Sequence, residues 1–144
     1  MLIEFEMDHV FYPGSDVVMD LQTAREMVDF LVRVNLVYLT RARALGHRIP
    51  RLYESGVRYE TVERWAPIPT LYRLRFGDCK NLAAALIAER RFYDQVDAQP
   101  AFRWVENADH TIDYHILEQE GTAFKDPSLD LGMNADLVAR FYAA

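Results

Sequence analysis

Hydrophobic residues recur at helical spacing over residues 17–45, which predicts one long helix in the first third of the chain. Its apolar face carries Leu21, Ala24, Val28, Leu31 and Leu39. Residues 23–26 have the form of a capping box, and Gly46 and Pro50 are expected to end the helix. Ahead of it, residues 1–12 alternate loosely between apolar and acidic residues, which indicates an early strand.

A second helix is predicted around the alanine- and leucine-rich run at residues 82–88. Asp78 stands before this run as its expected N-cap, so Cys79 falls in the first turn. Residues 46–76 lack a sustained period and are expected to be mostly loop with short helical turns.

The last third of the chain alternates with the period of strands. Three β-type segments are expected, at residues 101–105, 111–119 and 122–125. A turn at Glu120-Gly121 joins the second and third into an antiparallel arrangement, and residues 135–142 favour a short closing helix. The expected fold class is therefore α+β, with the Cys-bearing helix packed on a small antiparallel sheet and a long N-terminal helix beside it.

The chain has the length of one ordinary domain, 144 residues, and contains no repeat or linker. We expect a single domain over 1–144, divided into an N-terminal strand and long helix at 1–50, a central part at 51–133 and a C-terminal helix at 134–144.

Composition and charge exclude several classes of partner. Hydrophobic residues make up 51% and the formal charge is -6, which is typical of a folded protein that repels phosphate backbones, so nucleic acid is not an expected partner. A solvated face or a docking patch accounts for a local group of basic residues, namely Arg41, Arg43, Arg48, Arg51 and Arg58.

Targeting signals are not evident in the sequence. The first nine residues hold three acidic and no basic residues, unlike a secretory leader. The most apolar stretch, residues 28–39, is interrupted by polar residues and is shorter than a bilayer span. A cytoplasmic location and no membrane association are expected.

Cys79 is the single cysteine, so an intramolecular disulfide is not possible. A thiol acts as a nucleophile only as the thiolate, and a helix N-terminus or a histidine can favour that form. His115, on the predicted central strand, is the candidate base. Asp126, on the neighbouring strand, is the candidate carboxylate that orients the imidazole.

Secondary roles are assigned to three further residues. The backbone N–H of Cys79 is one candidate donor to an oxyanion, with Trp65 or Tyr59 as a second from a side chain. Asp78 lines the site as the residue before the nucleophile.

Each candidate also has an ordinary structural explanation. Cys79 has the character of a small buried hydrophobe, His115 of a hydrogen-bonded core histidine, and Asp126 of a turn residue before a proline. From spacing alone, the triad and a chance arrangement remain equally open.

A metal site is the third possibility for this region. Four potential zinc or iron ligands lie within seven residues, namely Asp109, His110, Asp113 and His115. Strand alternation directs His110 away from the other three, so the site ranks below the triad and no metal is assigned. His9 and His47 are expected to be surface residues.

The residues that carry these candidates resemble the transglutaminase-like cysteine enzyme superfamily. The matching segments are Gly77-Asp78-Cys79 before an alanine-rich helix, Tyr114-His115, Asp126-Pro127, and upstream Trp65-Ala66-Pro67 with Pro69 and Leu71, which is similar to the bacterial transglutaminase-like cysteine peptidases. The resemblance covers roughly residues 53–133. More narrowly, residues 52–59 and the ending at residues 126–133 resemble short proteins encoded by tailed phages.

The resemblance implies a papain-like core, a Cys79-His115-Asp126 triad, acyl transfer through a thioester on a protein or peptide substrate, and no metal or organic cofactor. The sequence departs from the family pattern after the nucleophile, where many relatives carry two acidic residues and this chain has Lys80-Asn81. Lys80 either lowers the thiol pKa or marks an altered site. The superfamily also includes cross-linking enzymes, deamidases and inactive members, so the fold does not select the reaction.

Two functional hypotheses follow. The first is an intracellular thiol hydrolase or acyltransferase of phage origin. The second is a phage virion or assembly protein that keeps the fold with a vestigial site, contacts other phage structural proteins and uses Phe141 and Tyr142 as exposed aromatics.

Overall fold

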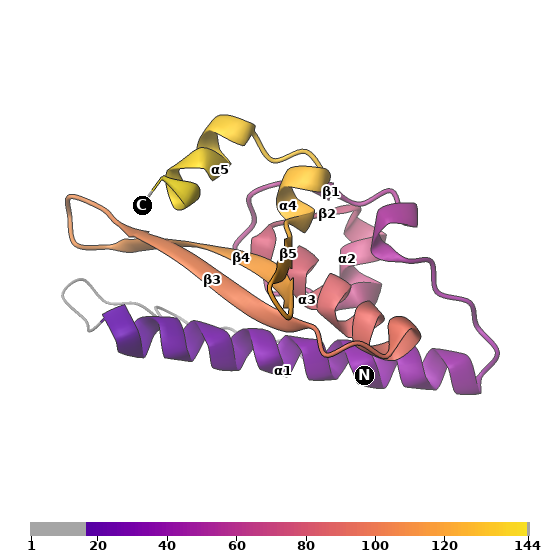
Figure 1. The fold of residues 1–144 in the computed structure, drawn as a ribbon. Helices are drawn as coiled ribbons and strands as arrows, with labels where there is room; N and C mark the ends of the chain where they lie inside the picture. Colours follow the sequence, from indigo (N-terminus) through magenta and orange to yellow (C-terminus); the bar gives the residue numbers. More distant parts are fainter. Residues whose placement is uncertain (1–16, 144) are drawn as a thin grey trace.

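The computed structural model describes residues 17–143 and shows a mixed α+β fold, as expected (Figure 1). The strand expected at residues 1–12 lies outside the described residues. Helix α1 (Val17–Ala44) confirms the predicted long helix. Residues 23–26 lie inside it and do not cap it, so the capping-box interpretation was wrong. Gly46 ends it with a φ of 74°, a left-handed conformation that glycine adopts without a steric penalty.

The segment after α1 contains more regular structure than the sequence indicated. It holds a short 3-10 helix, η1 (Leu52–Glu54), strand β1 (Arg58–Tyr59), helix α2 (Ile68–Leu74) and strand β2 (Phe76–Gly77). β1 and β2 pair in parallel. Two-residue strands are too short to produce a readable alternation, which explains why the sequence predicted only loop and short turns here.

Helix α3 (Cys79–Glu89) is central to the core and confirms the second predicted helix. Lys80 to Glu89 are all buried, because the helix is covered by α1 on one side and by the sheet on another. Gly77 permits this close packing: a Cβ there would lie 2.6 Å from Cδ1 of Leu71. A π-helical turn, η2 (Arg90–Asp94), follows α3.

The sheet consists of β3 (Gln99–Glu106), β4 (Ile112–Glu120) and β5 (Ala123–Lys125), antiparallel in that order. β4 is central, as predicted. Gly121 has a φ of 58° in the two-residue turn between β4 and β5, a backbone conformation typical of tight hairpins. Two helices end the chain, α4 (Pro127–Asp130) and α5 (Ala135–Tyr142), the latter at the predicted position.

The two faces of the sheet have different coverings. Phe102, Tyr114 and Ile116 pack against the hydrophobic core around α3. His115 pairs with Arg103 across β3 and β4, and strand alternation places both on the opposite face. The β3–β4 hairpin lies between α1 and α5 (Figure 1). The face that carries His115 is thus the one that α5 covers.

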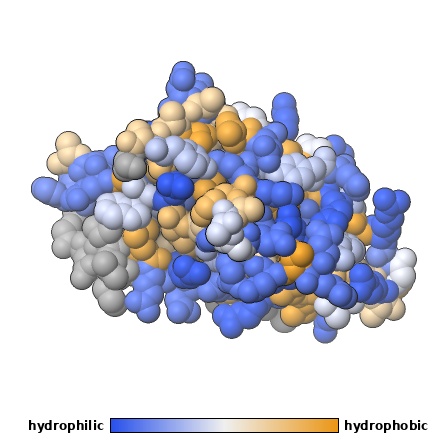
Figure 2. Space-filling view, viewed as in Figure 1, coloured by the Kyte–Doolittle hydropathy of each residue, from blue (hydrophilic) through white to orange (hydrophobic). Residues whose placement is uncertain are grey.

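None of the described helices is both long and apolar enough to cross a lipid bilayer. On the face drawn in Figure 2, hydrophobic residues lie in separate areas among hydrophilic ones. The basic residues noted in the sequence are mostly exposed, but Arg51 forms a bidentate ion pair with Asp94 at 2.7 and 2.9 Å, and the Arg43 guanidinium lies 4.1 Å from the Phe92 ring centroid. Part of this basic group therefore serves internal contacts.

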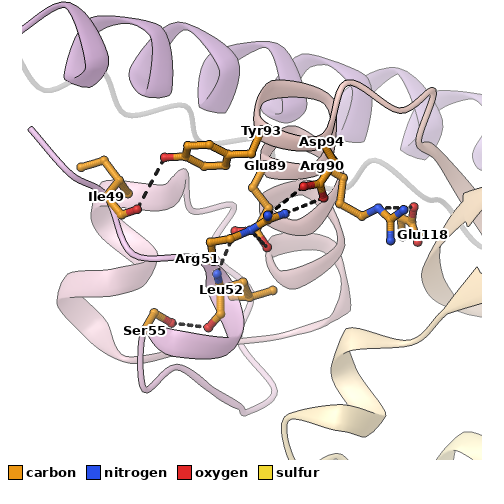
Figure 3. A network of polar contacts seen from close by, with 9 residues as sticks. All are labelled: Ile49, Arg51, Leu52, Ser55, Glu89, Arg90, Tyr93, Asp94 and Glu118. Carbon is orange, nitrogen blue, oxygen red and sulfur yellow. Dashed lines mark hydrogen bonds and ion pairs between the residues drawn. The ribbon is translucent and has the colours of Figure 1, made fainter.

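A polar network at the C-terminal end of α3 fixes the loop before η1 (Figure 3). The buried carboxylate of Glu89 accepts the backbone N–H of Leu52 at 2.8 Å and lies 3.7 Å from the guanidinium of Arg51. Arg90, the first residue of η2, forms an ion pair with Glu118 on β4 at 3.3 Å. The network joins α3, the loop and the sheet.

Glu89 is expected to make stability depend on pH near neutrality. Burial raises its pKa to about 7, against the opposing effects of the Leu52 N–H and Arg51. Because the folded pKa exceeds the unfolded value, the stabilising contribution of the protonated group is complete below about pH 4.5 and is lost as pH rises through about 7. Between pH 5 and pH 8, the free energy of unfolding of wild type should therefore fall by on the order of 2 kcal/mol relative to that of Glu89→Gln.

Urea denaturation of both proteins at four pH values between 5 and 8 measures this difference. Glu60→Gln, at an exposed position, is the matched control and should show no such trend. A difference between wild type and Glu89→Gln that stays constant with pH would contradict the assignment.

Candidate active site

His115 and Asp126 form a hydrogen-bonded pair on the α5 side of the sheet. His115 Nε2 lies 2.8 Å from Asp126 Oδ2, and the side chain of His115 is only 1% exposed. Lys125 on β5 is paired with Glu118 on β4. The next residue, Asp126, therefore comes opposite Leu117. Leu117 and His115 lie on the same face of β4, so Asp126 is diagonal to His115 on that face. The sequence predicted this hydrogen bond, and the structure contains it.

Asp126 holds several groups in addition to the imidazole. It occupies the N-cap of α4, where Oδ1 accepts the Leu129 N–H at 3.1 Å, and the Tyr142 hydroxyl donates to Oδ2 at 3.2 Å. Burial favours a higher pKa, but the hydrogen bonds from His115, Leu129 and Tyr142 outweigh it and hold the pKa of Asp126 below its ordinary value. The group is a carboxylate at neutral pH, as an orienting partner of histidine must be.

Cys79 lies at the open edge of β4. β5 pairs with β4 only from Glu118 to Glu120, so this edge of β4 is not covered by β5 at Tyr114 and Ile116. The thiol takes this position: Sγ lies 4.0 Å from the carbonyl oxygen of Tyr114, and the N–H of Ile116 donates to the sulfur. The start of α3 and strand β4 thus place Cys79 against the backbone of Tyr114 and Ile116, the residues before and after His115 in the sequence.

The thiol and the imidazole are not hydrogen-bonded to each other in residues 17–143 as the structure describes them. Burial raises the pKa of the Cys79 thiol to about 12, and the neighbouring Asp78 carboxylate contributes in the same direction. The Ile116 N–H and Lys80 act against this rise without cancelling it. In this environment the protonated form of the Cys79 thiol is favoured.

Lys80 lowers the pKa of the Cys79 thiol, one of the two roles considered from the sequence, but burial and the Asp78 carboxylate outweigh its effect. Its ammonium is paired with the Asp78 carboxylate and donates to the Val62 carbonyl at 2.7 Å. Asp78 occupies the N-cap position, but its side chain forms no cap hydrogen bond. The positive charge of Lys80 is thus paired with Asp78 at the start of α3.

Lys80 and Asn81 together fasten the loop at residues 62–66 to the start of α3. Asn81 Oδ1 accepts the Ala66 N–H at 2.9 Å, and its Nδ2 donates to the Arg64 carbonyl at 3.1 Å. Behind this loop lies a mainly apolar cavity of about 450 Å³. Lys80 and Asn81, the two positions where the sequence departs from the pattern of the family it resembles, therefore have a structural role that the sequence alone did not show.

The two side chains considered as oxyanion donors both pack against the core, as Cys79 does. Tyr59 is half-buried on β1, and burial raises the pKa of its hydroxyl, against the effect of a hydrogen bond with Thr61. The Trp65 ring instead lies 5.6 Å below the Lys80 ammonium. The first backbone N–H to enter the helical ladder of α3 is that of Leu82, so the N–H of Cys79 has no helical acceptor.

Helix α5 belongs to the site, which the sequence analysis missed. The Phe141 ring stacks on the His115 ring at 5.3 Å and is 8% exposed, so the expectation of an exposed aromatic was wrong for Phe141. Tyr142 is 43% exposed, yet its hydroxyl reaches Asp126. The two adjacent aromatics at the end of the closing helix were the available signal.

The four potential metal ligands engage separate partners. Asp109 accepts hydrogen bonds from Thr111, His110 contacts Glu106, Asp113 pairs with Arg140, and His115 pairs with Asp126. Within the described part of the chain, no group of three or more histidine, cysteine, aspartate or glutamate side chains is arranged to hold a metal ion. His47 is exposed, as expected, whereas His9 lies outside the described residues.

Comparisons of the chain with protein-family models, with curated proteins and with solved structures gave no match. Inference about function therefore depends on the geometry of the site and on the chemistry of its residues.

Proposed function

We propose that the protein is a transglutaminase-like thiol enzyme with a papain-like core, which hydrolyses or transfers acyl groups at peptide or side-chain amides. Cys79 is the nucleophile, His115 its base and Asp126 the orienting carboxylate. The observation that carries the proposal is the buried hydrogen bond between His115 and Asp126 beside the single thiol of the chain. A buried imidazole fixed by a carboxylate, next to a cysteine at a helix N-terminus, is the arrangement that acyl transfer by a thiol requires.

Proton transfer uses the second nitrogen of the imidazole. Asp126 holds Nε2, which leaves Nδ1 as the acceptor. When substrate binds, the thiol leaves the Tyr114 carbonyl and turns to Nδ1, which takes its proton as sulfur attacks the amide carbon. The imidazolium then protonates the leaving amine, so the C–N bond breaks and a thioester remains.

Release of the thioester completes the reaction. Water or a primary amine attacks the thioester carbon, His115 accepts its proton, and that proton returns to the sulfur as the C–S bond breaks. The oxyanion formed in each step is stabilised by the Cys79 N–H at the start of α3 and by the Tyr59 hydroxyl. Trp65 serves as packing for Lys80 in this scheme and not as a donor.

An amine-transfer assay tests the proposal. The full-length protein is incubated with a fluorescent primary amine and with candidate host or virion proteins, beside Cys79→Ala. Wild type should label a substrate protein or release ammonia or new peptide ends, and Cys79→Ala should do neither. Labelling indicates transfer, while ammonia or peptide release without labelling indicates hydrolysis. If wild type gives no product beyond that of Cys79→Ala, the enzymatic proposal fails.

A second function is favoured by one specific observation: Cys79 Sγ lies 4.0 Å from the Tyr114 carbonyl oxygen and forms no hydrogen bond with His115 within the described residues. A phage virion or assembly protein that keeps this fold needs no reactive thiol, and a half-buried thiol held against β4 fits a vestigial site. The two functions differ in a simple property: only the enzyme makes the reactivity of Cys79 depend on His115.

A further inference from the structure

Two adjacent residues of α5 contact both members of the His115–Asp126 pair. Phe141 lies against the His115 ring with an interplanar angle of 25° and a centroid distance of 5.3 Å. The Tyr142 hydroxyl donates to Asp126 Oδ2, the same oxygen that accepts from His115 Nε2. The carboxylate oxygen thus receives two hydrogen bonds, one from the sheet and one from the helix.

The position of α5 is set by contacts along its length. Val138 and Phe141 are its buried side chains, and Asn134 caps its start by accepting the Asp136 N–H at 2.8 Å. Arg140 donates to Asn107 at 3.1 Å and to Asp113 at 2.9 Å, on the β3–β4 hairpin. The helix is therefore held on the β3–β4 hairpin by Arg140 and by its two buried side chains.

Arg103 holds the tyrosine from the sheet. Its guanidinium lies 4.7 Å from the Tyr142 ring centroid and 5.9 Å from that of Phe124. Arg103 is the cross-strand partner of His115, so the same register that sets His115 on this face also sets the cation under Tyr142. A cation over the face of a tyrosine ring is attractive and limits the movement of the ring.

We infer that Phe141 and Tyr142 are positioning residues for the His115–Asp126 pair, so that α5 is an integral part of the active site and not only a cover. This inference rests on the proposed function. Tyr142 fixes the rotation of the carboxylate and takes a share of its charge, and Phe141 fixes the plane of the imidazole. Together they keep the proton on Nε2 and leave Nδ1 free to accept the thiol proton.

Burial and the Asp126 charge raise the pKa of Tyr142 to about 12, so its hydroxyl stays protonated and acts as a donor over the working pH range. Other charged and titratable groups lie on the elements packed against the pair. These are Arg103 on β3, Asp113 on β4, Asp130 on α4, Arg140 on α5, Tyr59 on β1, Tyr53 on η1, Cys79 on α3 and Asp78 at the N-cap of α3.

Histidine NMR of the full-length, ¹⁵N-labelled protein tests the inference without any need for activity. The His115 signals are assigned by their loss in His115→Gln. Wild type should show the Nε2–H tautomer. In Tyr142→Phe the carboxylate loses one of its two donors and is free to turn, so the Nε2–H signal of His115 should change position and its exchange with water should be faster. In Phe141→Leu, exchange of the Nε2 proton with water should be faster.

Leu137→Ala is the matched control, since Leu137 is 54% exposed on the same helix. Urea midpoints close to wild type confirm that each variant is folded. If Tyr142→Phe and Phe141→Leu change the His115 signals no more than Leu137→Ala does, α5 is only a cover and the inference is wrong. An unreactive Cys79 in wild type would instead overturn the proposed function, while leaving these histidine measurements interpretable.

Discussion

Replacing His115 with glutamine is expected to slow the reaction of Cys79 with iodoacetamide at pH 7 by between about 100- and 10,000-fold, the range by which a positioned base accelerates proton transfer. Without an acceptor for its proton, the buried thiol depends on its own ionisation, and its pKa is raised to about 12. Glutamine can still donate to Asp126 through its amide, so the hydrogen bond and the fold should persist. Single-turnover alkylation followed by mass spectrometry measures the rate.

His110→Gln is the control for this substitution, because the His110 side chain is exposed and pairs with Glu106, away from Cys79. Cys79 in His110→Gln should be alkylated at the wild-type rate. Equal rates in wild type and His115→Gln would mean that the imidazole does not assist the thiol, and the vestigial-site function would then stand.

Replacing Asp126 with alanine is expected to lower the free energy of unfolding by about 3 kcal/mol. The substitution leaves the buried Nε2 of His115 without an acceptor, which costs roughly 1 to 3 kcal/mol, and removes the N-cap of α4, worth about 1 kcal/mol. It also removes the acceptor of the Tyr142 hydroxyl. Urea denaturation at pH 7 measures the loss.

Asp130→Ala and Asp126→Asn separate the causes of that loss. Asp130 lies on the same helix and accepts only an exposed hydrogen bond from Tyr53 at 2.8 Å, so its removal should cost at most about 1 kcal/mol. Asparagine at 126 can keep the cap through its single side-chain oxygen, but its amide nitrogen, a donor, then stands where Oδ2 accepted from His115. Asp126→Asn should therefore restore only the cap contribution, about 1 kcal/mol. A loss for Asp126→Ala no greater than for Asp130→Ala would contradict the structural role of the pair.

Much of the fold could be predicted from the chain because its main elements are long and regular. The helices α1 and α3, the hairpin and α5 carry clear helical or two-residue periods, and Asp78 and Gly121 mark a helix start and a turn. The β1–β2 pair was not predictable, because it depends on residues that meet only after α2 has folded between them.

The site was predicted only in part, for a related reason. The hydrogen bond from His115 to Asp126 follows from strand register, which is a local property of one hairpin. The roles of Lys80, Asn81 and Phe141 depend on contacts with a distant loop or a distant strand, so neither spacing nor periodicity could indicate them.

The most direct test of the claim that His115 takes the proton of Cys79 is the pH dependence of the alkylation rate of folded wild-type protein. The account predicts a rate that already rises below the pH range in which a free thiol ionises, and that loses this rise in His115→Gln. A rate that increases only above about pH 8.5, as for an isolated thiol, or only after unfolding, would contradict it.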